Sequence, residues 1–171
     1  MAVFALASAC AHTDSFSEGV LRKGDLRVEV GPVPQTWRRV RVEGADLAFR
    51  DDAREGSTLF DVRCGRRDDD APLSVLTDHL MMGTTERDIE IQDVQPFDRR
   101  EAMHTLLHAK LDGVAMQYDI YVMKKDGCVY DLVYVAPPGR FAEGAADFER
   151  FAAGVHAAAG NRAAEASSRD P

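Results

Sequence analysis

Residues 111–128, LDGVAMQYDIYVMKKDGC, contain two Asp-Gly pairs on either side of a run rich in apolar side chains. Asp-Gly between such runs is the strongest short signal for a β-hairpin with a two-residue turn. We therefore expect tight turns at 112–113 and 126–127, each joining two antiparallel strands. Residues 100–135 then form a three-stranded antiparallel meander, on which the rest of the fold is built.

The two turns also predict the register of the meander, with Leu111 opposite Val114 and Lys125 opposite Cys128. In this register one face of the three strands is almost wholly apolar. A shift of one residue would move the apolar set of each strand to the opposite face, so the pattern supports the predicted pairing. The composition of residues 98–111 also suits a helix, and the sequence alone leaves that alternative open.

The second face of the predicted meander carries polar and aromatic groups, and it is our candidate binding face. Imidazole, carboxylate, amide and phenol groups on a rigid sheet suit the binding of a ligand or protein, because tyrosine gives contact area at low entropic cost. The alternative is an ordinary sheet face that solvent or a helix covers. The candidate residues are His104, His108, Gln117, Asp119, Tyr121, Tyr130 and Tyr134.

Shorter patterns on both sides of the meander complete a single expected domain over residues 25–159. Alternation of apolar and charged residues over 25–30 predicts a half-buried strand, and further short strands are expected up to Cys64. Residues 73–82 carry a helical apolar stripe between a proline and a glycine, and a second amphipathic helix is expected over 143–159. The predicted fold class is α+β, an antiparallel β-sheet meander packed with two or more helices.

The apolar N-terminus resembles an export signal. The run ends in Leu-Ala-Ser-Ala directly before Cys10, a pattern that resembles the lipobox of bacterial lipoproteins. It predicts a signal-peptide remnant over 1–9, acylation of Cys10 and a tether over 10–24. A signal peptide also begins with Lys or Arg, which residues 1–3 lack, so the alternatives are a start further upstream or an ordinary apolar N-terminus.

The other end of the chain is predicted to be a tail. Residues 160–171 contain no large apolar side chain, so this segment has nothing to bury against the domain. Segments of this kind do not offset the conformational entropy that folding costs. We expect a disordered tail there.

Charge excludes one class of partner. The chain of 171 residues carries 21 Lys and Arg against 29 Asp and Glu, a formal net charge of −8. This is the wrong sign for a protein that neutralises phosphates, so nucleic acid is not an expected partner. The sequence contains no Gly-x-Ser-x-Gly, phosphate-loop or Cys-x-x-Cys motif, and we expect no catalytic residues and no cofactor.

The number of cysteines is relevant to the cellular compartment, because disulfides form in oxidising compartments. If Cys10 carries lipid, Cys64 and Cys128 remain, and an even remainder in an exported protein suggests one disulfide. Both cysteines lie at predicted strand ends beside a glycine, where two strands can meet. The alternative is two separate buried thiols, which are common in cytosolic chains.

Two histidines offer a possible metal site. His104 and His108 are four residues apart, which is roughly 6 Å on one face of a helix, close enough to share zinc. On a strand the same spacing is about 13 Å, too far for one metal ion. The zinc-protease motif also needs a glutamate after the first histidine, and Thr105 stands there. We therefore expect no bound metal.

The resemblance to a known fold rests on Trp37 before Val40, Leu47-Ala48-Phe49, the helix Leu73 to Met82, Leu111-Asp112-Gly113, Tyr130 to Val135, Phe141 and Phe148-Glu149-Arg150-Phe151. With these stretches, the order of the predicted elements resembles the PsbP-like and DcrB-like α/β sandwich, over about residues 28–159. This superfamily includes many exported bacterial lipoproteins, and its members serve as assembly factors, import factors and accessory subunits. The resemblance implies a sandwich fold and leaves the function open, because one fold hosts many functions.

These patterns together predict a lipid-anchored protein of the bacterial cell envelope that faces the periplasm or the exterior. We expect a non-catalytic binding, scaffold or assembly role, with the membrane contacted through the lipid anchor and an envelope protein as partner. The alternative function is a small envelope enzyme or metal-binding protein that uses His104, His108 and Asp119.

Overall fold

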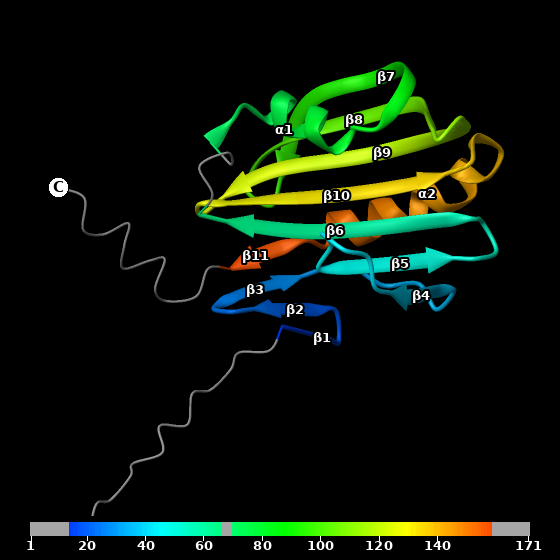
Figure 1. Cartoon of the computed structure of the whole chain (residues 1–171). Helices are drawn as coiled ribbons and strands as arrows, with labels where there is room; N and C mark the ends of the chain where they lie inside the picture. The colour runs from blue at the N-terminus through cyan, green and yellow to red at the C-terminus, as the bar shows by residue number, and fades with distance from the viewer. Residues whose placement is uncertain (1–13, 66–69, 159–171) are drawn as a thin grey trace, which may run out of the picture.

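The computed structural model describes residues 14–65 and 70–158, which form two antiparallel sheets and two helices (Figure 1). The strands are β1 (Ser15–Ser17), β2 (Val20–Lys23), β3 (Leu26–Glu29), β4 (Trp37–Val40), β5 (Leu47–Asp51), β6 (Gly56–Cys64), β7 (Thr84–Phe97), β8 (Arg100–Leu111), β9 (Val114–Lys125), β10 (Cys128–Ala136) and β11 (His156–Ala158), and the helices are α1 (Leu73–Leu80) and α2 (Pro138–Ala153). The smaller sheet has the order β1-β2-β3-β11, and the larger has the order β4-β5-β6-β10-β9-β8-β7. The predicted α+β class is confirmed. The signal-peptide remnant predicted over 1–9, Cys10 and the tail predicted over 160–171 lie outside the described residues.

The predicted register of the meander is confirmed. Leu111 pairs with Val114 across β8 and β9, and Lys125 pairs with Cys128 across β9 and β10. β8 is extended over its full length and has strand partners on both sides, so the helix alternative for residues 98–111 is wrong. β7 and β9 provide hydrogen-bond partners for the backbone N–H and C=O groups of β8, so these groups are satisfied without a helix.

The two Asp-Gly turns have the backbone conformation that their sequence favours. Asp112 and Asp126 each have φ of 51°, and the glycines after them have φ of 81° and 73°. Positive φ at both central residues is the type I′ turn, whose twist matches that of the flanking strands. Each pair of strands therefore leaves its turn in the register that the sequence predicts.

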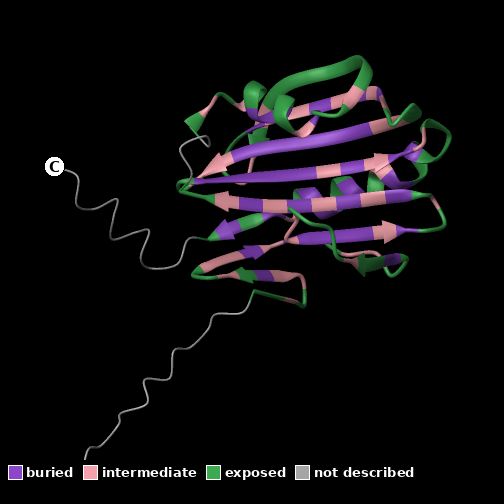
Figure 2. Ribbon diagram, in the orientation of Figure 1, coloured by how far each residue is buried: buried purple, intermediate pink, exposed green. Residues whose placement is uncertain are grey.

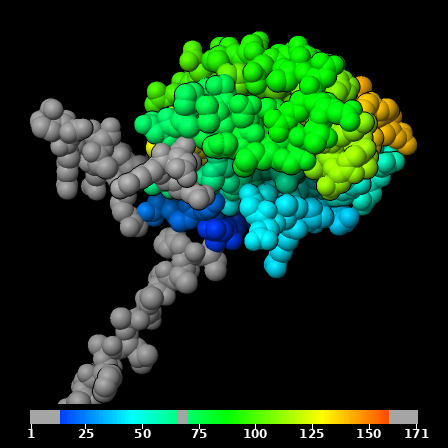
Figure 3. All heavy atoms as spheres, turned by 45° about the horizontal axis from the view of Figure 1, so that its top comes forward, coloured from blue at the N-terminus to red at the C-terminus, as the bar shows by residue number. Residues whose placement is uncertain are grey.

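No sequence pattern predicts β7, the longest strand of the larger sheet. Its side chains are exposed along almost its whole length, whereas β9 and β10 are mostly buried (Figure 2). Its register against β8 shifts twice, between Thr85 and Asp88 and between Ile89 and Ile91. Such bulges interrupt the two-residue alternation by which a strand is recognised in sequence. β7 and α1 lie in the foreground of Figure 3.

Each face of the larger sheet carries one helix, and we call the two faces the α2 side and the α1 side. On the α2 side, Phe148 lies 6.0 Å from Tyr121 and 5.7 Å from Tyr134, between ring centroids. On the α1 side, α1 packs over β8 and β9, and Leu76 is buried among apolar residues that include Leu107. Because side chains alternate along a strand, the register decides which residues each helix covers.

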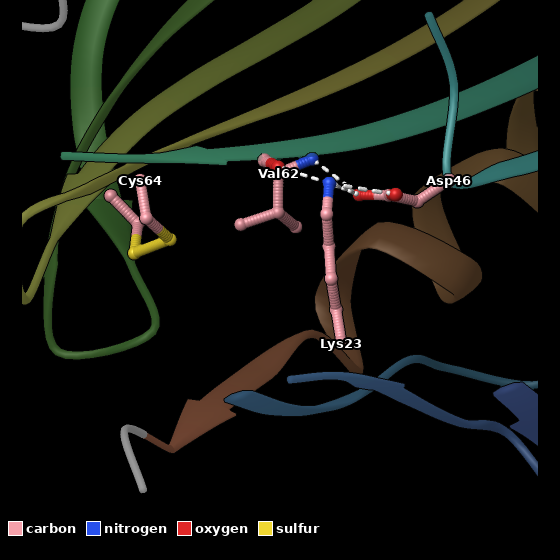
Figure 4. The surroundings of a disulfide bond; sticks show 5 residues. Lys23, Asp46, Val62 and Cys64 are labelled. Atoms are coloured by element: carbon pink, nitrogen blue, oxygen red, sulfur yellow. Dashed lines mark hydrogen bonds and ion pairs between the residues drawn. A yellow bond between two sulfur atoms is a disulfide. The ribbon is translucent and has the colours of Figure 1, made fainter. Parts of the chain in front are cut away.

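The tether expected over 10–24 is wrong for its described part, because residues 15–23 form β1 and β2. Lys23 Nζ donates to Asp46 Oδ2 at 2.8 Å and to the carbonyl of Val62 at 2.7 Å (Figure 4). Asp46 Oδ2 also accepts the backbone N–H of Val62 at 2.9 Å. These bonds join the N-terminal hairpin to β6, which explains why a polar segment packs onto the domain.

The second helix begins and ends earlier than the expected range of 143–159, because α2 spans 138–153 and β11 follows it. The N–H of Gly31 donates to the carbonyl of Phe151 at 2.9 Å, which satisfies one carbonyl of the last helical turn. A Cβ atom at Gly154 would lie 2.3 Å from the Cα of Gly31. Two glycines thus let the chain leave α2 against the end of β3 and pair as β11.

α2 lies close to the sheet at Gly144. A Cβ atom there would lie 2.1 Å from Tyr134 Oη and 2.9 Å from its Cζ. Tyr134 is 2% exposed, and its Oη donates to the carbonyl of Phe141 at 3.4 Å. The ring therefore has little room to move, and the position of the helix depends on a glycine at this contact.

We expect Gly144→Ala to lower the free energy of unfolding by about 1–3 kcal/mol, because it overpacks the contact with Tyr134. In urea denaturation, the double variant Gly144→Ala with Tyr134→Phe should lose less unfolding free energy than the two single variants together. Tyr134→Phe removes Oη, the atom that a Cβ at position 144 would approach most closely. Gly139→Ala is the control, because no heavy atom lies within 4 Å of a Cβ there. Equal losses for Gly139→Ala and Gly144→Ala would contradict this packing.

Candidate functional site

Cys64 ends β6 and Cys128 begins β10, and the two residues are directly paired across these antiparallel strands. Their sulfur atoms are 2.03 Å apart and their Cα atoms 4.1 Å apart, so the predicted disulfide is confirmed. Disulfides persist in oxidising compartments and are rare in the cytosol. The bond therefore indicates a location outside the cytoplasm.

His104 is the centre of a polar cluster on three neighbouring strands. Its Nε2 lies 2.9 Å from Asp119 Oδ1 on β9, and its Nδ1 lies 3.9 Å from Asp93 Oδ1 on β7. Its ring stacks on that of Tyr121, with the centroids 4.5 Å apart and the planes at 12°. The cluster forms because the register puts His104 directly opposite both Tyr121 and Asp93.

The charge state of His104 follows from this geometry. The hydrogen bond from His104 to Asp119 raises the pKa of the imidazole, and the negative charges of Asp119 and Asp93 act in the same direction. Burial of the ring opposes this effect but does not cancel it. The protonated imidazole is therefore stabilised between two carboxylates.

The register of β8, β9 and β10 places the candidate residues on one face of the sheet, and α2 packs against part of that face. Tyr130 is 0% exposed, Tyr134 is 2% exposed and Asp119 is 4% exposed. Burial raises the pKa of Tyr121, Tyr130 and Tyr134 to about 12. Tyr130 and Tyr134 are therefore part of the core, whereas Tyr121 also lines a surface cavity of about 440 Å³ between β7 and α2.

The open part of the candidate face lies toward β7. His104 and Gln117 are half-buried, and the His108 side chain is 37% exposed. His108 Nε2 lies 2.8 Å from Glu90 Oε1, so the two histidines have different carboxylate partners. Within residues 14–65 and 70–158, no group of three or more His, Cys, Asp or Glu side chains is arranged to hold a metal ion.

The His104–Asp119 pair has the geometry in which a carboxylate orients an imidazole for proton transfer. Its contacts, however, are with residues of the neighbouring strands: Asp119 is buried, and Tyr121 covers one face of the ring. We interpret the pair as a clamp that joins β8 to β9 and holds the edge strand β7 against them.

Sequence reasoning missed Asp98, which organises the opposite end of the sheet. Its buried carboxylate accepts bonds from Lys125 Nζ at 2.6 Å and from the N–H of Ala157 at 2.9 Å, and it lies 3.0 Å from His156 Nδ1. Burial favours a higher pKa, but these three bonds outweigh it and hold the pKa of Asp98 below its ordinary value. The sequence gives no turn signal here, because Asp98 and Arg99 both have positive φ although neither is glycine.

The described residues contain no helix that is long and apolar enough to cross a membrane. This finding concerns residues 14–65 and 70–158, to which α1 and α2 belong.

Solved structures share this fold at low sequence identity. Cyanobacterial PsbP (CyanoP) from Synechocystis sp. PCC 6803 matches with a TM-score of 0.58 and 14% identity, over 86% of this chain and 98% of that chain. LpqN, involved in cell envelope biogenesis of Mycobacterium tuberculosis, matches with a TM-score of 0.57 and 12% identity, over 80% and 86%. The chain therefore has the PsbP-like α/β-sandwich fold. No protein-family model matches the sequence, and no curated protein matches it either.

The His104 clamp predicts a pH-dependent contribution to stability. The folded pKa of His104 lies above its unfolded value, so its contribution is fully present below about pH 6.5 and is lost as the pH rises through the folded pKa. We expect the stability difference between the wild type and His104→Gln, measured by urea denaturation across this range, to shrink toward alkaline pH. Asp119→Asn should lower the pKa of His104 in an NMR titration. An unchanged His104 titration in Asp119→Asn would contradict the clamp.

Proposed function

We propose that this chain is a non-catalytic binding or assembly protein of the bacterial cell envelope, held to the membrane by a lipid on Cys10. The observation that carries the proposal is the Cys64–Cys128 disulfide between β6 and β10. A bond of this kind is stable in an oxidising compartment, which is where a lipobox-like N-terminus would deliver the chain.

The position of the first strand supports an anchored arrangement. β1 begins at Ser15, five residues after Cys10, and five residues span at most about 18 Å when fully extended. A lipid on Cys10 would therefore keep the smaller sheet near the membrane surface. The Lys23–Asp46 contact would transmit that restraint to the larger sheet.

The contacts of the histidines favour binding over catalysis. His104 and His108 lie four residues apart on a strand, about 13 Å along its axis, so they do not converge on one reacting atom. Their nearest acids, Asp119 and Glu90, belong to different strands on opposite sides of β8. LpqN, which shares the fold, is involved in cell envelope biogenesis, and this supports a role of similar class here.

We expect Cys10→Ser to move the protein from the membrane fraction to the soluble fraction. Each buried methylene contributes about 0.8 kcal/mol, and two or more acyl chains hold a protein to a membrane where one hardly does. Cell fractionation with immunoblotting measures the change. The double variant Cys64→Ser with Cys128→Ser is the control, because it loses cysteines that are not at the proposed lipidation site and should stay in the membrane fraction. Unchanged membrane attachment of Cys10→Ser would contradict the anchor.

The binding role is tested by crosslinking intact cells and purifying the wild-type protein from envelope fractions. A partner that is recovered reproducibly with the wild type, and at lower yield with Cys10→Ser, supports an anchored binding protein. Conversion of an envelope substrate by the purified chain, with loss of that activity in Asp119→Asn, would support the enzyme alternative and overturn the proposal.

A further inference from the structure

A cavity of about 300 Å³ opens on the α1 side of the sheet, away from the His104 clamp. Leu59, Val133 and Val135 form its apolar floor, with Tyr118 beside them. The loop at 43–45 and the end of α1 form its walls. It has the size and mostly apolar lining of a ligand-binding pocket.

The cavity exists because α1 is short. This helix has eight residues and packs over β8 and β9, so the floor residues on β6 and β10 remain half-buried in the middle of the sheet. Large apolar side chains stand exposed at the mouth: Met82 is 70% exposed and Leu111 is 42% exposed. Val114, which pairs with Leu111, is 59% exposed. Exposed apolar groups gathered around a hollow are typical of a protein interaction site.

Tyr118 supplies a second, independent observation. The residue is 9% exposed and lines the cavity, and its Oη has no hydrogen-bond partner among the residues that the structure describes. A buried hydroxyl without a partner is costly, and native structures rarely retain one without a reason. A polar atom of a bound group can supply the missing hydrogen bond to this hydroxyl.

The charges of the lining favour a cationic partner. Glu43, Asp61 and Asp131 line the cavity together with Arg63, which pairs with both Asp131 and Asp61, the latter at 3.4 Å. These lining residues therefore carry more negative than positive charge, and the chain as a whole has a net charge of −8. Charge of one sign around a recess attracts the opposite sign and raises the rate of association.

We propose that this cavity receives an aromatic side chain of the protein partner, flanked in the partner's sequence by Lys or Arg. The inference rests on the proposed function, since it names the place where the partner binds. A cavity of about 150 Å³ holds benzene, so about 300 Å³ accommodates an indole or phenol group. Both groups combine an apolar ring with a polar atom for the Tyr118 hydroxyl, and anchors of this type dominate many interfaces.

Three acetylated and amidated tripeptides test the proposal as probes: Lys-Trp-Lys, Lys-Ala-Lys and Glu-Trp-Glu. In a titration of the methyl-labelled protein, Lys-Trp-Lys should shift the NMR signals of Leu59, Val133 and Val135 in a saturable manner. The other two should bind about ten-fold more weakly, because each lacks either the ring or the positive charge.

Two variants link these shifts to the cavity. Tyr118→Phe keeps the ring and removes the unpaired hydroxyl, so Lys-Trp-Lys should bind about two- to ten-fold more weakly while the protein stays folded. Met82→Ala removes an exposed apolar group from the mouth and should also weaken binding. Val75→Ala is the matched control, because Val75 is a 40% exposed apolar residue of α1 that does not line the cavity.

Absent or equal shifts with Lys-Trp-Lys and Lys-Ala-Lys would overturn the proposal. So would methyl shifts that occur with octyl glucoside but with none of the peptides, since the cavity would then hold an amphiphile. Crosslinking of Met82→Ala in cells separates the two proposals. If this variant and the wild type capture the same partner equally well, the binding role stands and this site is wrong.

Discussion

The register of β8, β9 and β10 is the constraint on which the rest of the structure depends. Two type I′ turns set it, at 112–113 and 126–127, and the Cys64–Cys128 bond then ties β6 to the same set of strands. Because successive side chains point to opposite faces, this one choice assigns every residue of the meander to α1 or to α2. His104 meets Asp119, and Tyr118 faces the cavity, for the same reason.

The two faces differ because the two helices differ in length. α2 has sixteen residues and packs against Tyr121 and Tyr134, whereas α1 has eight and leaves part of its face open. The face that looks functional by composition is therefore largely core, and its imidazole–carboxylate pair holds strands together. The opposite face, which looks like ordinary core in sequence, has a cavity lined by the exposed side chains of Met82 and Leu111 and by Tyr118, whose buried hydroxyl has no hydrogen-bond partner among the described residues.

Local signals in the sequence were sufficient for the features that depend on local chemistry. The Asp-Gly turns and α1 follow from residues close to each strand or helix end, whereas the Cys64–Cys128 pairing joins residues 64 positions apart and the sequence left two separate thiols as an alternative. β7, β1 and β2 could not be predicted in this way, since bulges hide the alternation in β7 and long-range bonds such as Lys23–Asp46 hold the N-terminal hairpin. The burial of Tyr134 depends on where α2 crosses the sheet, and Gly144 permits that close approach although no strand pattern reveals it.

The Cys64–Cys128 bond indicates a location outside the cytoplasm, and the proposed role depends on that bond being formed in the cell. Acid quenching of growing cells, followed by alkylation of free thiols and mass spectrometry of the recovered chain, reads the state of both cysteines directly. We expect both to be protected from the label until a reductant is added. Full labelling of Cys64 and Cys128 in unreduced samples would contradict an oxidising location and, with it, the envelope role.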